Sequence, residues 1–168
     1  MTNSNNKLGK IILVGAGPGD AGLFTLQGKH WLQKADVVLF DHLVNEDLLR
    51  FTQKETEIIY VGKKEGVASL EQEAINALLT EKAKEGKIVV RLKGGDPFIF
   101  GRGGEEIQAA NKFQIPFLIV PGITSINGVA AYAGIPLTHR NLSSSLSVIT
   151  GSNEKNQGDI HIDWKKIA

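Results

Sequence analysis

The 168-residue chain has a formal net charge of +1, with 42% hydrophobic and 22% charged residues. This composition is typical of one globular domain, or of one domain with part of a second, and it argues against broad nucleic-acid binding. The absence of cysteine excludes a disulfide scaffold, a thiolate metal site and a cysteine nucleophile. The apolar runs are far shorter than the ~20 residues of a membrane span, and the N-terminus lacks the apolar core of a signal peptide. We therefore expect a cytoplasmic protein.

Short β-branched runs alternate with amphipathic patterns from the N-terminus onward. In chain order the patterns predict a strand at 11–16, a helix at 23–35, strands at 36–40 and 57–61, a helix at 69–85, a strand at 87–92, a helix at 105–113, a strand at 117–120 and a helix at 124–133. This alternation predicts βαβ units and an α/β domain built on a mostly parallel five-stranded sheet. We assign this domain to residues 8–138.

The character of the sequence changes beyond Pro136. THRNLSSS is a polar, serine-rich stretch typical of a connection between domains, and SLSVITG at 145–151 predicts a new strand. One strand and a short helical stretch cannot bury a hydrophobic face by themselves. We therefore expect residues 139–168 to form a linker and only the start of a second α/β domain.

Glycine-rich or polar loops follow the predicted strands. They are GAGPGD, FDHLV, VGKK, KGGDPFIFGRGGEE and PGITS. Ligands of parallel α/β sheets bind at the carboxyl ends of the strands, so these loops predict a single site at one edge of the sheet.

Two nucleotide-binding motifs are possible in principle. Residues 17–22 fit G-x-G-x-x-G, and Asp41 ends the next strand, which is the outline of a dinucleotide fingerprint. Pro18 disfavours it, because proline removes a backbone N–H where a phosphate needs donors. A P-loop is disfavoured because His30 follows Gly28-Lys29 and offers no hydroxyl to magnesium. No acidic or histidine cluster has metal-ligand spacing, so we expect no metal.

The run GGDPFIFGRGGEE at 94–106 is harder to explain by structure alone. Glycines allow backbone to approach a ligand closely, and the phenylalanines supply an apolar wall. A simpler interpretation of its end is that Glu105 and Glu106 favour a helix N-terminus and that Arg102 pairs with them. Thr124 and Ser125 are expected at the next helix N-cap, where a cap can also face a ligand.

In this order, VGAGPGD, FDHLV, VGKK, KGGDPFIFGRGGEE, VPGITS and AYAGIPLTHR resemble the motifs of the tetrapyrrole methylases, from about Lys10 to Arg140. The resemblance implies transfer of methyl groups from S-adenosylmethionine to two pyrrole carbons of uroporphyrinogen III, giving precorrin-2 on the route to sirohaem and cobalamin. It also implies two α/β domains with the cofactor folded between them, S-adenosylhomocysteine as the second product, and a homodimer that binds a small tetrapyrrole rather than a nucleic acid or a membrane.

The resemblance carries roles onto particular positions. The implied cofactor contacts are Pro18, Gly94, Gly95, Asp96, Ile99, Thr124 and Ser125, with backbone used at 94–96. Asp41 and Lys63 match positions proposed for the proton acceptor and the proton donor. Arg102, Glu105 and Arg140 match positions proposed to hold the tetrapyrrole. Arg102 has also been considered a catalytic base, but we interpret it as a substrate clamp, because the pKa of arginine exceeds ~12.

The implied chemistry is compatible with these residue types. Methyl transfer depends mainly on orienting the methyl donor and the acceptor carbon. A carboxylate such as Asp41 can take the proton that the methylated pyrrole later loses. The forked guanidinium of arginine suits a substrate with several carboxylates. The chain is shorter than usual for the family, and its single methionine is Met1. We therefore expect a C-terminally truncated chain with half a cleft. Three alternatives stay open: a methylase of a later corrinoid, a non-catalytic cofactor-binding module and a nicotinamide dehydrogenase.

Overall fold

A computed structural model describes residues 8–62 and 71–150, and the chain divides into two units, residues 1–136 and 137–168. In the first unit five strands form one sheet in the order β3-β2-β4-β1-β5. All the strand pairs are parallel, which confirms the predicted α/β class. The elements in chain order are β1 (Lys10–Gly15), η1 (Ala21–Leu23), α1 (Leu26–Leu32), β2 (Val37–Phe40), η2 (Glu46–Phe51), β3 (Glu57–Tyr60), α2 (Gln72–Lys84), β4 (Ile88–Lys93), α3 (Gly103–Lys112), β5 (Phe117–Val120) and α4 (Ser125–Tyr132).

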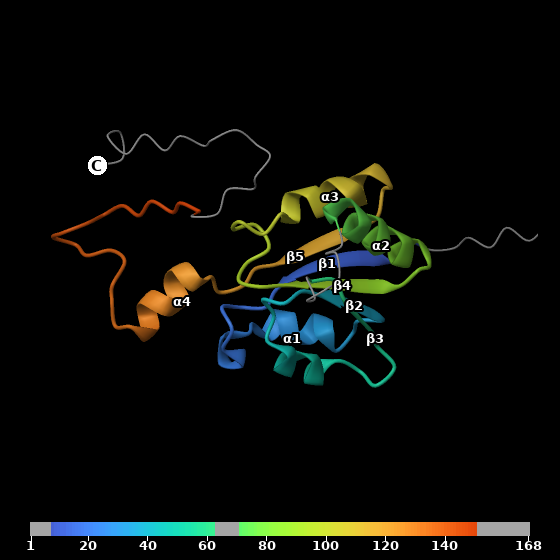
Figure 1. Ribbon diagram of the computed structural model, residues 1–168, viewed down its shortest axis with the longest axis horizontal. Coiled ribbons are helices and arrows are strands. Elements are labelled where there is room, and N and C mark those ends of the chain that lie inside the picture. The colour runs from blue at the N-terminus through green and yellow to red at the C-terminus, as the bar shows by residue number, and fades with distance from the viewer. Residues whose placement is uncertain (1–7, 63–70, 151–168) are drawn as a thin grey trace, which may run out of the picture. The chain divides into compact units, whose positions relative to one another are not determined.

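The sheet is covered on both faces, by α1 and η2 on one side and by α2 and α3 on the other (Figure 1). Successive strand residues point to opposite faces, so each central strand feeds two cores. Ile12, Val38 and Val90 pack toward α1 and η2, whereas Leu13 and Leu39 pack toward α2 and α3. Each such fully buried side chain contributes roughly 1.5–3 kcal/mol. The continuous apolar runs of the central strands are the sequence signature of this two-sided burial.

The first helix is shorter than predicted. The segment expected to be helical from residue 23 first forms the 3₁₀ turn η1, which is capped by the Asp20 carboxylate accepting from the Gly22 N–H at 2.6 Å. Thr25 then starts α1 by accepting from the Gly28 N–H at 3.0 Å. Two capping side chains in succession therefore divide the segment. The 3₁₀ turn η2 was not predicted, because it has only six residues and begins at the N-cap Asn45 within a polar stretch.

The second unit contains a tight turn at its start. The His139 N–H donates to the Ser143 carbonyl at 2.9 Å, and the Leu142 N–H donates to the His139 carbonyl at 3.0 Å. The prediction of a strand at 145–151 is wrong for residues 145–150, which form no strand, and residue 151 lies outside the described residues. A strand exists only through hydrogen bonds to a neighbour, and no described strand pairs with these residues. Among the described residues, no helix is long and apolar enough to cross a membrane.

Candidate active site

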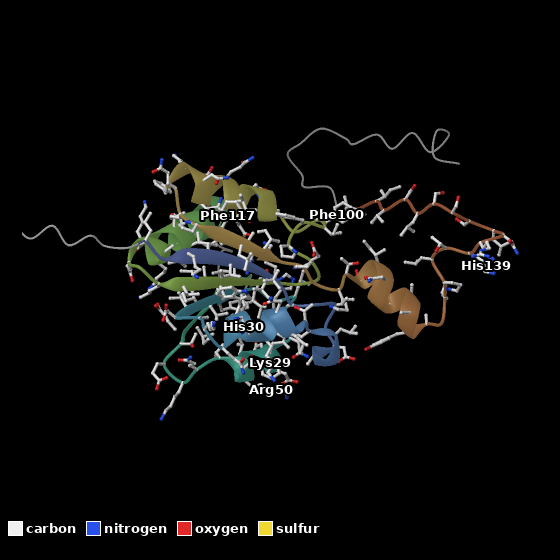
Figure 2. All side chains as sticks on the ribbon, turned by 180° about the vertical axis from the view of Figure 1, so that it is seen from behind. Lys29, His30, Arg50, Phe100, Phe117 and His139 are labelled. Carbon is white, nitrogen blue, oxygen red and sulfur yellow. The ribbon has the colours of Figure 1, made fainter. Side chains whose placement is uncertain are left out.

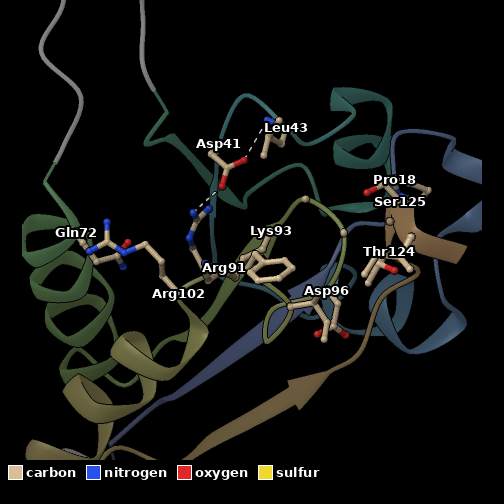
Figure 3. A pocket seen from close by; sticks show the side chains of 17 residues that line it. Pro18, Asp41, Leu43, Gln72, Arg91, Lys93, Asp96, Arg102, Thr124 and Ser125 are labelled. Carbon is tan, nitrogen blue, oxygen red and sulfur yellow. Dashed lines mark hydrogen bonds and ion pairs between the residues drawn. The ribbon is translucent and has the colours of Figure 1, made fainter. Parts of the chain in front are cut away.

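The loops at the carboxyl end of the sheet surround a cavity of about 440 Å³ (Figure 3). This volume is in the range of small-molecule and cofactor sites. In Figure 3, Gln72 and Arg102 lie at one end, Pro18, Thr124 and Ser125 lie at the other, and Asp41 lies between. The cavity is lined by Gly17, Pro18, Asp41, Leu43, Gln72, Arg91, Lys93, Gly94, Gly95, Asp96, Ile99, Phe100, Gly101, Arg102, Thr124, Ser125 and Ile126. These residues all belong to the first unit.

Three glycine-containing loops meet through their backbones at this cavity. Gly17 and Gly95 exchange two hydrogen bonds, with N···O distances of 2.7 and 3.2 Å, and both have positive φ. A Cβ on Gly122 would lie 2.1 Å from the Gly95 carbonyl oxygen, so the loop after β5 packs directly on the loop after β4. Glycine is required here by close approach and by backbone conformation together. The result is a cavity wall made largely of backbone.

Asp96 ties two of these loops together. One carboxylate oxygen accepts from the Phe98 N–H at 2.8 Å, and the other accepts from the Gly122 N–H at 3.0 Å. The side chain is therefore engaged within the protein, and a ligand beside this turn would meet its backbone. The neighbouring wall is the first turn of α4, where Thr124 donates its backbone N–H and its hydroxyl to the Asn127 carboxamide oxygen at 3.2 and 2.9 Å.

A network of four charged side chains lies at the cavity, which all of them except Glu106 line. The Arg91 guanidinium donates from Nη2 to Asp41 at 2.7 Å and from Nε to Glu106 at 3.2 Å (Figure 3 shows the Asp41 contact). The Lys93 ammonium lies 3.1 Å from Glu106 Oε1 and 3.0 Å from Oε2, the latter as an ion pair without an aligned hydrogen bond. Gln72 adds a weak contact to Oε1 at 3.4 Å. The formal charges of the network sum to zero.

Burial makes this network unusual. Arg91, Lys93 and Glu106 are only 4%, 5% and 1% exposed, whereas the Asp41 side chain keeps 21% of its surface accessible at the cavity. Burial lowers the pKa of Lys93 from its usual value, an effect that the negative charge of Glu106 opposes and the positive charge of Arg91 reinforces. Asp41 is therefore the network's exposed carboxylate, with its other oxygen accepting from the Leu43 N–H at 3.1 Å.

Arg102 and Glu105 form a pair at the start of α3. The guanidinium donates to the carboxylate from Nε at 2.7 Å and from Nη2 at 2.9 Å, and this contact holds the pKa of Glu105 below its usual value. Both side chains are nearly half exposed, and Arg102 lines the cavity while Glu105 does not. Arg102 has φ of 57° and Phe100 has φ of 51°, which are left-handed conformations that cost of order 1–3 kcal/mol each. Phe100 is 62% exposed on this loop (Figure 2).

The structure thus brings Asp41, Arg102 and the seven expected cofactor-contacting residues to one cavity. Lys63 lies outside the described residues. Arg140 belongs to the second unit, in the turn after His139. Of the residues that the structure describes, no group of three or more histidine, aspartate or glutamate side chains could hold a metal ion.

Sequence reasoning missed Arg91, Lys93 and the buried position of Glu106. A signal was present, because IVVRLK places two cations on the same face of a strand that is otherwise apolar. Charged side chains are almost never fully buried unless they are paired. Such a pattern therefore indicates an anionic partner on the covering helix, which here is Glu106.

An all-parallel α/β domain with a backbone-lined cavity at the carboxyl ends of its strands defines a class of small-ligand-binding domains. Comparison with known proteins narrows this class. A family model for tetrapyrrole (corrin/porphyrin) methylases matches residues 10–165. The chain belongs to this family.

Curated relatives agree with this membership. The chain is 52% identical to uroporphyrinogen-III C-methyltransferase of Methanocaldococcus jannaschii, over 95% of this chain and 66% of the relative. It is 55% identical to siroheme synthase of Zymomonas mobilis, over 100% of this chain and 35% of the relative. The chain therefore spans less than two thirds of the length of either relative.

Solved structures show the same fold. A structure of uroporphyrin-III C-methyltransferase from Thermus thermophilus matches with a TM-score of 0.70 at 46% identity, covering 79% of this chain and 56% of that chain. A structure of this enzyme complexed with S-adenosylhomocysteine matches with a TM-score of 0.66 at 44% identity, covering 82% of this chain and 53% of that chain.

Proposed function

We propose that the protein transfers methyl groups from S-adenosylmethionine to carbon atoms of uroporphyrinogen III, giving precorrin-2 for sirohaem or cobalamin synthesis. The observation that carries this proposal is the cavity, which collects every position implied as a cofactor contact on one edge of the sheet. The 52% identity to a uroporphyrinogen-III C-methyltransferase supports the choice of substrate. The Thermus enzyme's complex with S-adenosylhomocysteine supports the choice of cofactor.

The residues present suit this cofactor. The cradle favours glycine at Gly17 and Gly95 because their φ is positive, and at Gly122 because a Cβ would meet the Gly95 carbonyl oxygen. Backbone groups rather than charged side chains therefore face a neutral adenosine moiety. Asp96 keeps that cradle closed by joining the loops after β4 and β5. The bound cofactor supplies an electrophilic methyl group on a sulfonium. The protein's task is then mainly to align this group with a ring carbon, and alignment can contribute up to about 7–11 kcal/mol in ideal cases.

Asp41 is the group that we assign to proton removal from the methylated pyrrole. It has surface at the cavity, and its two oxygens are oriented by Arg91 and by the Leu43 N–H. Carboxylates are effective acceptors when they lie within hydrogen-bonding reach of the proton. Lys63 is proposed as the matching proton donor.

Arg102, Glu105 and Arg140 are proposed to hold the tetrapyrrole. Uroporphyrinogen carries carboxylates, for which a guanidinium offers two parallel donors. Glu105 already orients Arg102 by a bidentate contact at the rim of the cavity. We further propose that the protein is a homodimer in the cytoplasm and that it binds neither nucleic acid nor a membrane.

Calorimetric titration of the 168-residue chain with S-adenosylhomocysteine tests the cofactor assignment, with NAD as the control ligand. We expect binding of S-adenosylhomocysteine alone. Binding of NAD alone would overturn the assignment. Binding of neither ligand would show that this chain lacks an essential wall of the cofactor site.

An anaerobic assay with labelled S-adenosylmethionine and uroporphyrinogen III then tests turnover. Label in the tetrapyrrole supports the proposal, whereas cofactor binding without transfer would make this chain a non-catalytic binding module. A structure of cobalt precorrin-4 methyltransferase also matches, with a TM-score of 0.69 at 35% identity. A later corrinoid offered in parallel therefore distinguishes the first methylation from a later one.

A further inference from the structure

The pair formed by Lys93 and Glu106 has no role in the methyl transfer proposed above. Both side chains are at least nine-tenths buried. Glu106 does not line the cavity, and Lys93, which does, keeps only 6% of its side-chain surface accessible, compared with 21% for Asp41. Replacing a buried ion pair by apolar residues of similar size is often neutral or stabilising. Stability alone is therefore a poor explanation for this pair.

The geometry of Arg91 offers a better explanation. Its planar guanidinium is held on three sides, with Nη2 on Asp41 at 2.7 Å, Nε on Glu106 at 3.2 Å and Nη1 on the Leu92 and Leu39 carbonyls at 2.9 and 3.4 Å. Each side that is held restricts the orientation of the rigid, planar fork further. Glu106 is the charged group that holds the Nε edge, and Lys93 holds Glu106.

We propose that Glu106 is a positioning residue, which Lys93 fixes in place and which orients Arg91 so that Arg91 keeps the Asp41 carboxylate directed into the cavity. The inference rests on the proposed function, in which Asp41 accepts the proton. It extends the site from the cavity surface to the first turn of α3. Through this chain of contacts the helix that follows β4 sets the direction of a carboxylate that follows β2.

Two double variants isolate this role. Lys93→Met with Glu106→Gln and Lys93→Met with Glu106→Leu leave the same charges, Arg91 and Asp41, and both remove the ammonium. They differ in one respect: the glutamine side chain keeps an oxygen that can accept from Arg91 Nε, and the leucine side chain does not. Glutamine and leucine are both close to glutamate in size, and both are uncharged. Neither variant therefore leaves a buried, unpaired carboxylate at position 106.

We expect the leucine variant to have a kcat about 10- to 100-fold below that of the glutamine variant, because a small misplacement of a reacting group can cost 10²-fold. The KM for uroporphyrinogen III and the affinity for S-adenosylhomocysteine should agree within about twofold between the two variants. They differ only at position 106, which does not line the cavity. Equal kcat values would overturn the inference and reduce Glu106 to a counterion of Lys93.

Crystal structures of the two variants give a test that needs no activity. The Arg91 Nη2 to Asp41 Oδ2 contact, 2.7 Å here, should persist in the glutamine variant and be lost in the leucine variant. Its persistence in both variants would overturn the inference. A wild-type chain without turnover would instead count against the proposed function, and the comparison of the two structures would still decide the role of Glu106.

Discussion

Asp96 shows how much of the cavity depends on a single side chain, because its two oxygens join two loops by accepting from the Phe98 and Gly122 N–H groups. Asp96→Ala leaves both donors without this partner. We expect a loss of about 2–3 kcal/mol in the free energy of unfolding and at least a tenfold weaker affinity for S-adenosylhomocysteine. Urea denaturation and calorimetry measure the two effects.

Asp36 provides the matched control for Asp96. Its carboxylate accepts from the Ile88 N–H at 2.7 Å, at the amino end of the sheet and away from the cavity. Asp36→Ala should also destabilise the fold, by about 1–3 kcal/mol, while the affinity for S-adenosylhomocysteine stays unchanged. If both variants weakened the affinity for S-adenosylhomocysteine equally, Asp96 would affect binding through the general stability of the fold and not through the cradle.

Lys93 makes stability depend on pH in a defined direction. Its pKa is lowered in the folded chain, chiefly by burial, with Glu106 opposing and Arg91 reinforcing the shift, and Asp41 adding a small opposing effect. Between that lowered pKa and the ordinary value of 10.5, the unfolded chain holds the proton and the folded chain releases it. The contribution of Lys93 to the free energy of unfolding therefore rises with pH in this window and is constant below it.

Comparison with Lys93→Met isolates this contribution. The free energy of unfolding of the wild type minus that of the variant should increase as the pH rises toward the ordinary value of 10.5. Chemical denaturation at a series of pH values measures it. A difference that stays flat or falls over this range would contradict the assignment of a lowered pKa to Lys93.

Among the elements, β4 illustrates what the sequence could and could not predict. Its apolar, β-branched run predicted a strand at 87–92, and the structure confirms a strand there, which lies buried at the centre of the sheet. The pairing of Arg91 and Lys93 with Glu106 could not be predicted, because it depends on which helix covers which face and in what register. Periodicity reports burial along one element, whereas the partner of a buried charge lies on another element.

The other differences have the same origin. The loops after all five strands were predicted to form one site because parallel strands end at the same edge. The loops after β1, β2, β4 and β5 do line one cavity, and the loop after β3 lies largely outside the described residues. The segment 145–150 has a strand-like sequence, but it belongs to no strand of the described sheet. Local sequence gives a tendency to extend, and pairing decides whether a strand forms.

The contact between the loops after β4 and β5 can be tested with two glycines. A Cβ at Gly122 would meet the Gly95 carbonyl oxygen at 2.1 Å, whereas a Cβ at Gly104 in α3 would meet nothing within 4 Å. Gly122→Ala should lower the free energy of unfolding by about 1–3 kcal/mol and weaken the affinity for S-adenosylhomocysteine at least severalfold. Gly104→Ala should leave binding unchanged and stabilise the fold by up to about 1 kcal/mol.

Thermal unfolding and calorimetry on the two alanine variants measure these effects. Gly104→Ala controls for the added methyl group and for any general change in the helix. Normal ligand affinity in Gly122→Ala would mean that the loops can separate without disturbing the cavity, and that the close packing has no part in binding.

For the molecule as a whole, the division into two units determines which part of the chain a bound ligand should stabilise. Every described residue that lines the cavity lies between positions 17 and 126, inside the first unit. A ligand that binds only the folded state, at about 100 times its Kd, stabilises that state by about 2.7 kcal/mol. The slowest-exchanging amides, which open only by unfolding of the whole unit, should then exchange about 100-fold more slowly.

Hydrogen exchange with peptide resolution tests this expectation, with S-adenosylhomocysteine as ligand and NAD as control. The strands β1, β4 and β5 should gain protection, because unfolding of their sheet destroys the cavity that their loops form. Residues 137–150 belong to the other unit and should exchange at the same rate with and without the ligand. Equal protection of both regions would mean that the second unit contributes to cofactor binding even in this chain, and that the cavity in the first unit is only part of the site.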